Sequence, residues 1–271
     1  MRRLSAIMPR PVSLVPTMGA IHEGHLALVK KARRFAGRTG TTITSLFVNP
    51  IQFGPGEDYQ KYPRTFRSDC ALLDKGSCDF VFAPTANDMY LPDSTTTVLE
   101  STLSQGMCGA SRPGHFAGVC TVVSKLFHIV RPDFAIFGEK DYQQLAVLRR
   151  MVRDLNFPVR IVSHPIVREA DGLALSSRNR YLSNEERKQA AVLYATLLEA
   201  EKKIKKGWNS ASQVKEWIHA TINKQKLAKV DYVVAVEPVT LENVDRIQFP
   251  VLLAVAVFFG STRLIDNRLV K

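Results

Sequence analysis

The sequence has no apolar segment long enough to cross a lipid bilayer. Its longest uninterrupted apolar run is Val251–Phe259, far shorter than the roughly 20 residues that a transmembrane helix needs. Near the amino terminus, Pro9, Pro11 and Pro16 interrupt the stretch in which the apolar part of a secretory signal would have to lie. We therefore expect neither a membrane span nor a secretory signal.

Cysteine is scarce, and its spacing matches no metal-binding or disulfide motif. The four cysteines, Cys70, Cys78, Cys108 and Cys120, include no C-x-x-C pair. This usage is typical of a reducing compartment, in which buried thiols act as small apolar groups. We expect a cytoplasmic protein.

The sequence also lacks a concentrated block of charge, although 37 Lys and Arg against 25 Asp and Glu give a net charge of +12. Proteins that bind nucleic acids usually gather their basic residues in a stripe or a tail, whereas here the excess is spread over both halves of the chain. The densest basic run, at 202–206, follows glutamates of a predicted helix and is typical of a solvated helix end. We expect no nucleic-acid partner, and the positive charge favours anionic small substrates.

What the sequence does contain is an ordinary globular composition, with 45% apolar and 23% charged residues over 271 positions. In the first part of the chain, β-branched apolar runs alternate with segments of helical apolar spacing, which is typical of a parallel sheet covered by helices. The predicted strands are 12–16, 41–48, 79–83, 134–137 and 159–162, and the predicted helices are 23–35, 67–75, 119–130 and 143–155. Ligands of such sheets bind at the carboxyl ends of the strands.

After about residue 166 the pattern changes to helices followed by strands. A loop at 168–179 precedes a long predicted helix at 185–206, a second helix at 210–225, strands at 230–236 and 251–259, and a short strand at 263–266. The predicted fold class is therefore α/β, with a Rossmann-like parallel-sheet domain at 1–166 and a smaller C-terminal α+β lid domain at 167–271.

The strongest local signal is the segment Thr17-Met18-Gly19-Ala20-Ile21-His22-Glu23-Gly24-His25, at the junction between the first predicted strand and the first long helix. A helix N-terminus attracts phosphate through unpaired N–H groups and partial positive charge, and imidazole N–H groups can donate to phosphate oxygens. Two other interpretations of the histidine pair stay open. It could bind zinc, although no further ligands have suitable spacing, or it could be two surface histidines without a role.

Three further clusters suit a nucleotide or a polar substrate. Gly138-Glu139-Lys140-Asp141 follows a predicted strand, where the lysine can meet phosphate; the alternative is a plain connection with Asp141 capping a helix. Leu175-Ser176-Ser177-Arg178-Asn179 can bind an anion or can simply be a polar interdomain loop. Gln52 in the segment 49–53, and the turn at 112–116, offer polar groups, and for each a turn without function is the alternative.

Taken together, these motifs resemble those of one family, the pantothenate synthetases (pantoate–β-alanine ligases) of the H-x-G-H nucleotidyltransferase superfamily. The resemblance covers nearly the whole chain and runs in order through 14–19, 47–53, 62–65, 110–116, 137–144, 171–179 and 264–267. It implies an ATP-dependent reaction in two steps. The carboxylate of (R)-pantoate attacks ATP to give pantoyl adenylate and pyrophosphate, and β-alanine then displaces AMP to give pantothenate.

The resemblance also implies roles for individual residues. His25 would be the proton-donating catalytic residue, and His22 would stabilise phosphate. ATP would contact Met18, Gly19, Ala20, Ile21, His22, Glu23, Gly24, His25, Gly138, Glu139, Lys140, Asp141, Val167, Leu175, Ser176, Ser177 and Arg178. Gln52 would contact pantoate and β-alanine, and Gln144 would contact pantoate. Mg²⁺ would be held mainly by ATP, with Asp69 as a candidate protein ligand, and the chain would form a homodimer.

Three rival functions use the same features. Another H-x-G-H nucleotidyltransferase, acting on a phosphorylated small molecule, would share the histidines but would not depend on β-alanine. An RNA-binding module would show an affinity that falls steeply with salt. A zinc protein would retain metal on His22 and His25 through purification.

Overall fold

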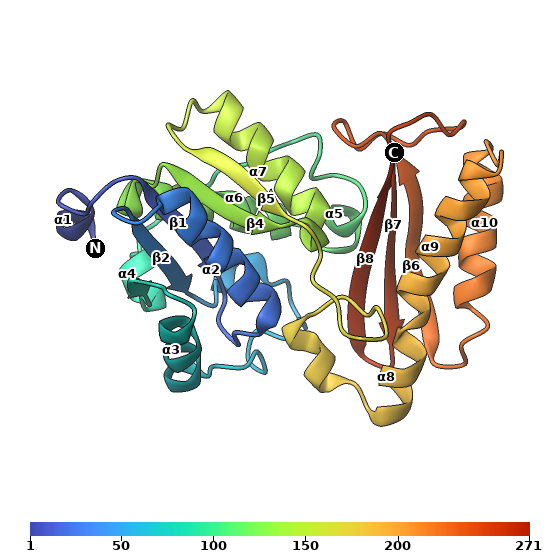
Figure 1. Cartoon of the computed structure of the whole chain (residues 1–271), viewed down its shortest axis with the longest axis horizontal. Helices are drawn as coiled ribbons and strands as arrows, with labels where there is room; N and C mark the ends of the chain where they lie inside the picture. The colour runs from blue at the N-terminus through green and yellow to red at the C-terminus, as the bar shows by residue number, and fades with distance from the viewer. The chain divides into compact units, whose positions relative to one another are not determined.

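Five short strands within the first 165 residues form a parallel sheet (Figure 1). In the computed structural model, which describes all residues from Met1 to Lys271, these strands are β1 (Val12–Thr17), β2 (Thr41–Leu46), β3 (Phe80–Phe82), β4 (Phe134–Gly138) and β5 (Arg160–His164). Neighbouring strands pair in parallel, in the order β3-β2-β1-β4-β5. This is the doubly wound order of Rossmann-like folds, whose strand order reverses between β1 and β4. The predicted fold class is confirmed.

The helices that accompany this sheet are α1 (Arg2–Ser5), α2 (Glu23–Ala36), α3 (Phe66–Lys75), α4 (Ala86–Met89), α6 (His115–Val130) and α7 (Tyr142–Asp154), and α2 and α6 pack against its strands. Helix α2 lies across β1 and β4 (Figure 1). Its Leu26, Val29 and Ala32 are three residues apart and pack into one cluster with Val15 and Ile136 of those strands. This apolar spacing explains why the segment is a helix and which face of it is buried. No helix combines the length and the apolar composition of a transmembrane span.

Two compact units make up the chain. The first comprises Met1–Gln105, Arg112–Glu139 and Gln144–Pro165, and the second comprises Gly106–Ser111, Lys140–Gln143 and Ile166–Lys271. The sheet of the second unit is antiparallel, in the order β6 (Ala228–Val236), β7 (Val251–Phe259) and β8 (Thr262–Val270). Its helices are α5 (Cys108–Ser111), α8 (Asn184–Ala190), α9 (Val192–Lys205) and α10 (Ala211–Ile222). Strand β7 is apolar along its whole length and almost entirely buried, as a central strand should be.

Two predicted elements of the second unit were wrong in extent. The segment predicted as one long helix at 185–206 is two helices, α8 and α9, which meet at Ala191. The backbone angles of Ala191 stay in the right-handed helical region. The short strand predicted at 263–266 is the full-length β8, which pairs with every residue of β7. Two buried polar residues, Asp266 and Asn267, interrupt the apolar alternation that would predict the whole strand from sequence. Asp266 forms an ion pair with Arg168.

Candidate active site

The loop between β1 and α2 holds an unusual backbone conformation. Gly19 and Ala20 are consecutive residues with positive φ, +83° and +52°, a region that non-glycine residues rarely enter. A Cβ atom on Gly19 would also lie 3.1 Å from Oδ2 of Asp69. The N–H of Gly19 donates to Oγ1 of Thr17 (3.2 Å), whose hydroxyl donates to the carbonyl oxygen of Ser45 (2.7 Å). These bonds tie the strained loop to β1 and β2.

A buried carboxylate completes the support of this loop. Oδ2 of Asp69 accepts from the N–H of Ala20 (3.0 Å), and Oδ1 accepts from the N–H of Ile21 (2.9 Å) and from the hydroxyl of Thr65 (3.0 Å). Asp69 itself is only 3% exposed. Both oxygens are therefore occupied by bonds that fix the loop, and this gives Asp69 a structural role beneath the histidine motif.

The two histidines of the motif meet at the first turn of α2. His22 is the N-cap of this helix, and its Nδ1 accepts from the N–H of Gly24 (3.1 Å). An Nδ1 that accepts carries no proton, so in neutral His22 the proton sits on Nε2, which is then a donor. The rings of His22 and His25 lie 4.0 Å apart between centroids, tilted by 32°. An imidazole pair at a helix N-terminus is a donor site suited to phosphate oxygens.

Gln52 lies beside this loop, in the 3₁₀ turn η1 (Pro50–Gln52) that follows β2. Its Nε2 donates to Sδ of Met18 (3.2 Å), and its Oε1 accepts from Nδ2 of Asn49 (3.0 Å). The hydroxyl of Tyr90 donates to Oδ1 of Asn49 (2.8 Å). Burial raises the pKa of Tyr90, so this phenol keeps its proton and remains a donor. The Gln52 amide is thus held at both ends, next to the histidine motif.

The predicted cluster at 138–141 is divided between the two units. In the first unit, Gly138 ends β4, and Oε1 of Glu139 accepts from the hydroxyl of Ser163 (2.7 Å). In the second unit, Nζ of Lys140 lies 3.6 Å from a carboxylate oxygen of Asp141. Residues 139–141 form the 3₁₀ turn η2, which leads directly into α7.

The two adjacent glutamines at the start of α7 differ in their surroundings. Gln144 is half-buried, whereas Gln143 is buried. Within the second unit, Oε1 of Gln143 accepts from the N–H of Cys108 (2.9 Å), and its Nε2 donates to the carbonyl oxygen of Gly106 (2.7 Å). Gln143 is therefore committed to holding backbone groups of its own unit.

In the second unit, Val167 and the segment 175–178 belong to one hairpin. The N–H of Leu175 donates to the carbonyl oxygen of Val167 (3.0 Å). Ser176 is the N-cap of the 3₁₀ turn η3 (Ser177–Tyr181), and its Oγ accepts from the N–H of Arg178 (3.3 Å). The structure therefore brings these predicted residues together on a folded turn.

Ion pairs anchor this hairpin, a feature that the sequence did not indicate. Arg168 pairs with the buried carboxylate of Asp266 at 2.7 Å. Arg187 pairs with Asp171 and with Glu169, each at 2.6 Å. The hydrogen bond from Arg187 is the main cause that lowers the pKa of Asp171. The hairpin is thus fixed to both a strand and a helix of its own unit.

Within the first unit, the structure gathers one set of predicted residues at the carboxyl edge of the sheet: the histidine motif after β1, Gln52 after β2 and Gly138 at the end of β4. Lys140, Asp141, Val167 and the segment 175–178 form a second set in the second unit. Sequence reasoning missed the support that Asp69 gives to the loop and the link from Tyr90 to Asn49. These contacts join residues 40 or more positions apart, and no local pattern announces them.

Comparison with known proteins identifies one family along nearly the whole chain. The family model described as pantoate-beta-alanine ligase matches residues 2–269. A pantothenate synthetase from Thermoanaerobacter sp. (strain X514) is 51% identical over 260 residues, which cover 96% of this chain and 91% of that protein. One from Caldicellulosiruptor saccharolyticus is 52% identical over 262 residues, which cover 97% and 92%. These matches do not favour a different H-x-G-H nucleotidyltransferase.

Solved structures agree with the sequence comparison. Pantothenate synthetase from Thermus thermophilus superposes with a TM-score of 0.94 at 47% identity, over 99% of this chain and 96% of that one. A pantoate-beta-alanine ligase from Francisella tularensis, solved in complex with beta-gamma ATP and beta-alanine, superposes with a TM-score of 0.79 at 32% identity, over 96% and 90%. The chain belongs to the pantoate–β-alanine ligase family, the pantothenate synthetases.

Proposed function

We propose that this protein joins (R)-pantoate to β-alanine at the expense of ATP. A pantoate carboxylate oxygen bonds to the α-phosphorus of ATP and pyrophosphate leaves. The amine of β-alanine then bonds to the acyl carbon, AMP leaves, and pantothenate forms. The observation that carries this proposal is the histidine pair at the N-terminus of α2, on a loop whose Met18 contacts the Gln52 amide, in a chain that matches the ligase family over residues 2–269.

The ATP site proposed here uses the loop from Met18 to His25. The helix N-terminus and the Nε2 donor of His22 suit phosphate oxygens, whose charge rises as the carboxylate approaches. His25 donates a proton to the leaving pyrophosphate. The proposed ATP contacts elsewhere are Gly138, Glu139, Lys140, Asp141, Val167, Leu175, Ser176, Ser177 and Arg178. The cations among them offset the repulsion between two anionic reactants.

The proposed site for pantoate uses neutral amides. Gln52 and Gln144 can donate to a carboxylate and accept from hydroxyls without adding charge. Gln52 also contacts β-alanine, which must reach the acyl carbon after adenylation. The bonds from Asn49 and to Met18 orient the Gln52 amide before substrate arrives.

Mg²⁺ enters this proposal with the nucleotide. No group of three or more His, Cys, Asp or Glu side chains in the protein is arranged to hold a metal ion. A hard ion that keeps phosphate and water ligands needs no such group. Metal binding by Asp69 stays a prediction, one for which its three accepted hydrogen bonds offer no support.

Three further parts of the proposal extend the expectations from the sequence and, for the dimer, from the family. Residues 1–166 act as the nucleotide- and pantoate-binding domain and 167–271 as the smaller lid domain, the protein works in the cytoplasm, and it acts as a homodimer. Leu91 and Leu99, each 66% exposed, flank a threonine-rich segment that joins no strand of its own chain, and such a segment suits pairing with a second copy. Sedimentation at several concentrations tests the dimer.

Product analysis tests the proposed reaction. The purified protein should release AMP from Mg²⁺–ATP over many turnovers only when pantoate and β-alanine are both present. One pantothenate should form for each AMP released. Release of AMP that ignores β-alanine but requires a phosphorylated acceptor would instead assign another nucleotidyl transfer.

A further inference from the structure

An arginine, a glutamate and a histidine form a network behind Gln52, in the same unit. Nε of Arg112 donates to Oε1 of Glu57 (2.7 Å), and Nη2 donates to Oε2 (2.6 Å), which is a two-point ion pair. Nη1 of Arg112 lies 3.0 Å from Nε2 of His115, and Nδ1 of His115 lies 2.8 Å from the carbonyl oxygen of Gln52. The network therefore ends on the backbone carbonyl of Gln52, the residue whose side-chain amide is proposed to bind substrate.

The chemistry of the partners fixes the direction of each bond. A guanidinium only donates, so Nε2 of His115 must accept from Arg112. A carbonyl oxygen only accepts, so Nδ1 of His115 must donate to Gln52. These two bonds together select one neutral tautomer of His115. Burial would raise the pKa of Glu57, but the bonds and charge of Arg112 outweigh it and lower that pKa, so the ion pair stays charged.

Close packing leaves η1 little room to move. A Cβ atom on Gly118 of α6 would lie 2.5 Å from the carbonyl oxygen of Ile51 and 2.6 Å from Cα of Gln52. Nδ2 of Asn49 also donates to the carbonyl oxygen of Gly118 (3.1 Å). The backbone of Gln52 is thus pressed against α6 and bonded to the residue that begins it, His115.

We infer that Glu57, Arg112 and His115 are positioning residues that fix the orientation of the Gln52 amide. Glu57 orients Arg112, and Arg112 selects the tautomer of His115. The Gln52 carbonyl oxygen then accepts from Nδ1 of His115 (2.8 Å) and, through a longer bond, from Nη2 of Arg112 (3.4 Å). None of the three needs to touch the reacting atoms. The inference rests on the proposed function, because it takes Gln52 as the amide that binds pantoate and β-alanine.

The first test compares His115→Ala with His115→Asn. Asparagine places its Nδ2 donor near the position of Nδ1 and can restore the bond to Gln52. We expect the alanine variant to raise KM for pantoate and for β-alanine roughly tenfold, the worth of one buried hydrogen bond. KM for ATP should stay within twofold, and the asparagine variant should recover much of the loss. Unchanged KM values for both substrates in His115→Ala, with wild-type turnover intact, would overturn the inference.

A double-mutant cycle with Gln52→Ala separates positioning from direct contact. Gln52→Ala removes the amide whose orientation the network fixes. His115→Ala and Arg112→Lys should therefore add little to the KM effects of Gln52→Ala. Effects that persist in full in the Gln52→Ala background would mean direct contact with substrate and would contradict the inference. Arg112→Lys keeps the charge and loses the two-point geometry, and it supplies a second test if His115→Ala folds poorly.

Two measurements keep the inference distinct from the proposed function. If the wild-type protein makes no pantothenate, the proposed function is wrong. If wild-type activity is normal and the variants keep the wild-type KM values, only the positioning role is wrong. Asp79→Asn is the matched control for Glu57→Gln, because each removes the carboxylate partner of an arginine in the first unit. Glu57→Gln should raise both KM values, and Asp79→Asn should change neither.

Discussion

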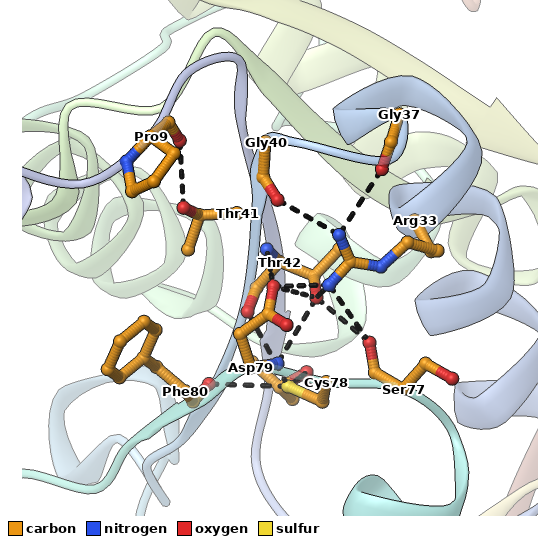
Figure 2. Close-up of polar contacts among 11 residues, drawn as sticks. Pro9, Arg33, Gly37, Gly40, Thr41, Thr42, Ser77, Cys78, Asp79 and Phe80 are labelled. Carbon is orange, nitrogen blue, oxygen red and sulfur yellow. Dashed lines mark hydrogen bonds and ion pairs between the residues drawn. The ribbon is translucent and has the colours of Figure 1, made fainter.

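The two edges of the parallel sheet use the same kinds of side chain for different purposes. One edge joins strands, and the other supports a strained loop. At the amino edge, Arg33 donates to the carbonyl oxygens of Gly40 (2.9 Å) and Ser77 (3.3 Å), to the hydroxyl of Thr42 (2.7 Å) and to the carboxylate of Asp79 (Figure 2). Asp79 in turn accepts from the N–H of Thr42 (2.7 Å). Every one of these bonds joins parts of the protein to each other, and the network locks the starts of β2 and β3 together.

At the carboxyl edge, comparable bonds hold a backbone that would otherwise relax. Asp69 accepts two backbone N–H groups, as a carboxylate often does, but these belong to a loop with two consecutive residues at positive φ. The loop presents the helix N-terminus, His22 and His25. The comparison shows that residue type alone does not mark a site. What marks it is a strained, supported loop at the strand ends where ligands bind in this fold.

The largest effect should come from the carboxyl edge, at His25. We expect His25→Ala to slow adenylation roughly 10²–10³-fold, the usual cost of one lost transition-state donor, and to leave the thermal unfolding temperature near that of the wild type. Rapid-quench measurement of pyrophosphate release checks the rate. His219→Ala, an exposed histidine on α10, is the matched control and should be silent. A His25→Ala rate within threefold of wild type would remove this side chain from the mechanism.

Next in size is the change Gln52→Ala. Loss of the amide should raise KM for pantoate and β-alanine by roughly 10- to 100-fold, because polar groups of the bound substrate would lose their hydrogen-bond partner. ATP affinity should hardly change, since the proposed ATP contacts remain. Steady-state kinetics with each substrate varied in turn provide the measurement. An effect on ATP alone would mean that the amide faces the nucleotide.

Asp69→Asn should act through the loop, with a smaller effect. An asparagine turns one acceptor oxygen into a donor facing a backbone N–H, so one loop N–H loses its partner, at a cost of about 1–3 kcal/mol. We expect about a tenfold fall in kcat/KM for ATP together with a lower unfolding temperature. The Mg²⁺ concentration for half-maximal activity should stay the same. A marked shift in that concentration would support Asp69 as a metal ligand and contradict its structural role.

The smallest effect on activity should come from the amino edge. Asp79→Asn should leave all kinetic constants unchanged and lower the free energy of unfolding. Burial would raise the pKa of Asp79, but bonds from Thr42 and Arg33 outweigh it and lower the pKa in the folded protein. The stability that Asp79 contributes is therefore present above its unfolded pKa, about 3.9, and is lost as pH falls through the lower folded value.

Denaturant titrations across pH check this sign. The stability difference between wild type and Asp79→Asn should be constant from about pH 6 to 7 and should shrink below about pH 4. A difference that grows on acidification would show that the folded pKa is raised, and a loss of catalysis would break the contrast between the two edges.

Much of the first unit was predictable because its elements are local. The apolar spacing of Leu26, Val29 and Ala32 predicted α2, and the β-branched run at 41–48 predicted β2, although the strand ends at Leu46. The resemblance, carried by the H-x-G-H segment and the other motifs in order, gave the family. The identity of each site residue as a substrate or nucleotide contact stays a prediction.

What the sequence could not provide depends on distant residues. The bond from Asp69 to the loop spans 48 or more positions, and the bond from His115 to Gln52 spans 63. Strand β8 was underestimated because its buried polar residues Asp266 and Asn267 break the apolar alternation, and their partners come from elsewhere in the second unit. Burial satisfied by a remote partner leaves no local trace.

Isotope transfer tests the central claim most directly. In the proposed reaction the attacking oxygen of the pantoate carboxylate becomes bonded to the α-phosphorus and leaves with AMP when the amine attacks the acyl carbon. With pantoate labelled by ¹⁸O in its carboxylate, the account predicts that each AMP released carries one ¹⁸O, and that His25→Ala slows the transfer without abolishing the label. Unlabelled AMP, formed together with pantothenate, would contradict the acyl-adenylate mechanism.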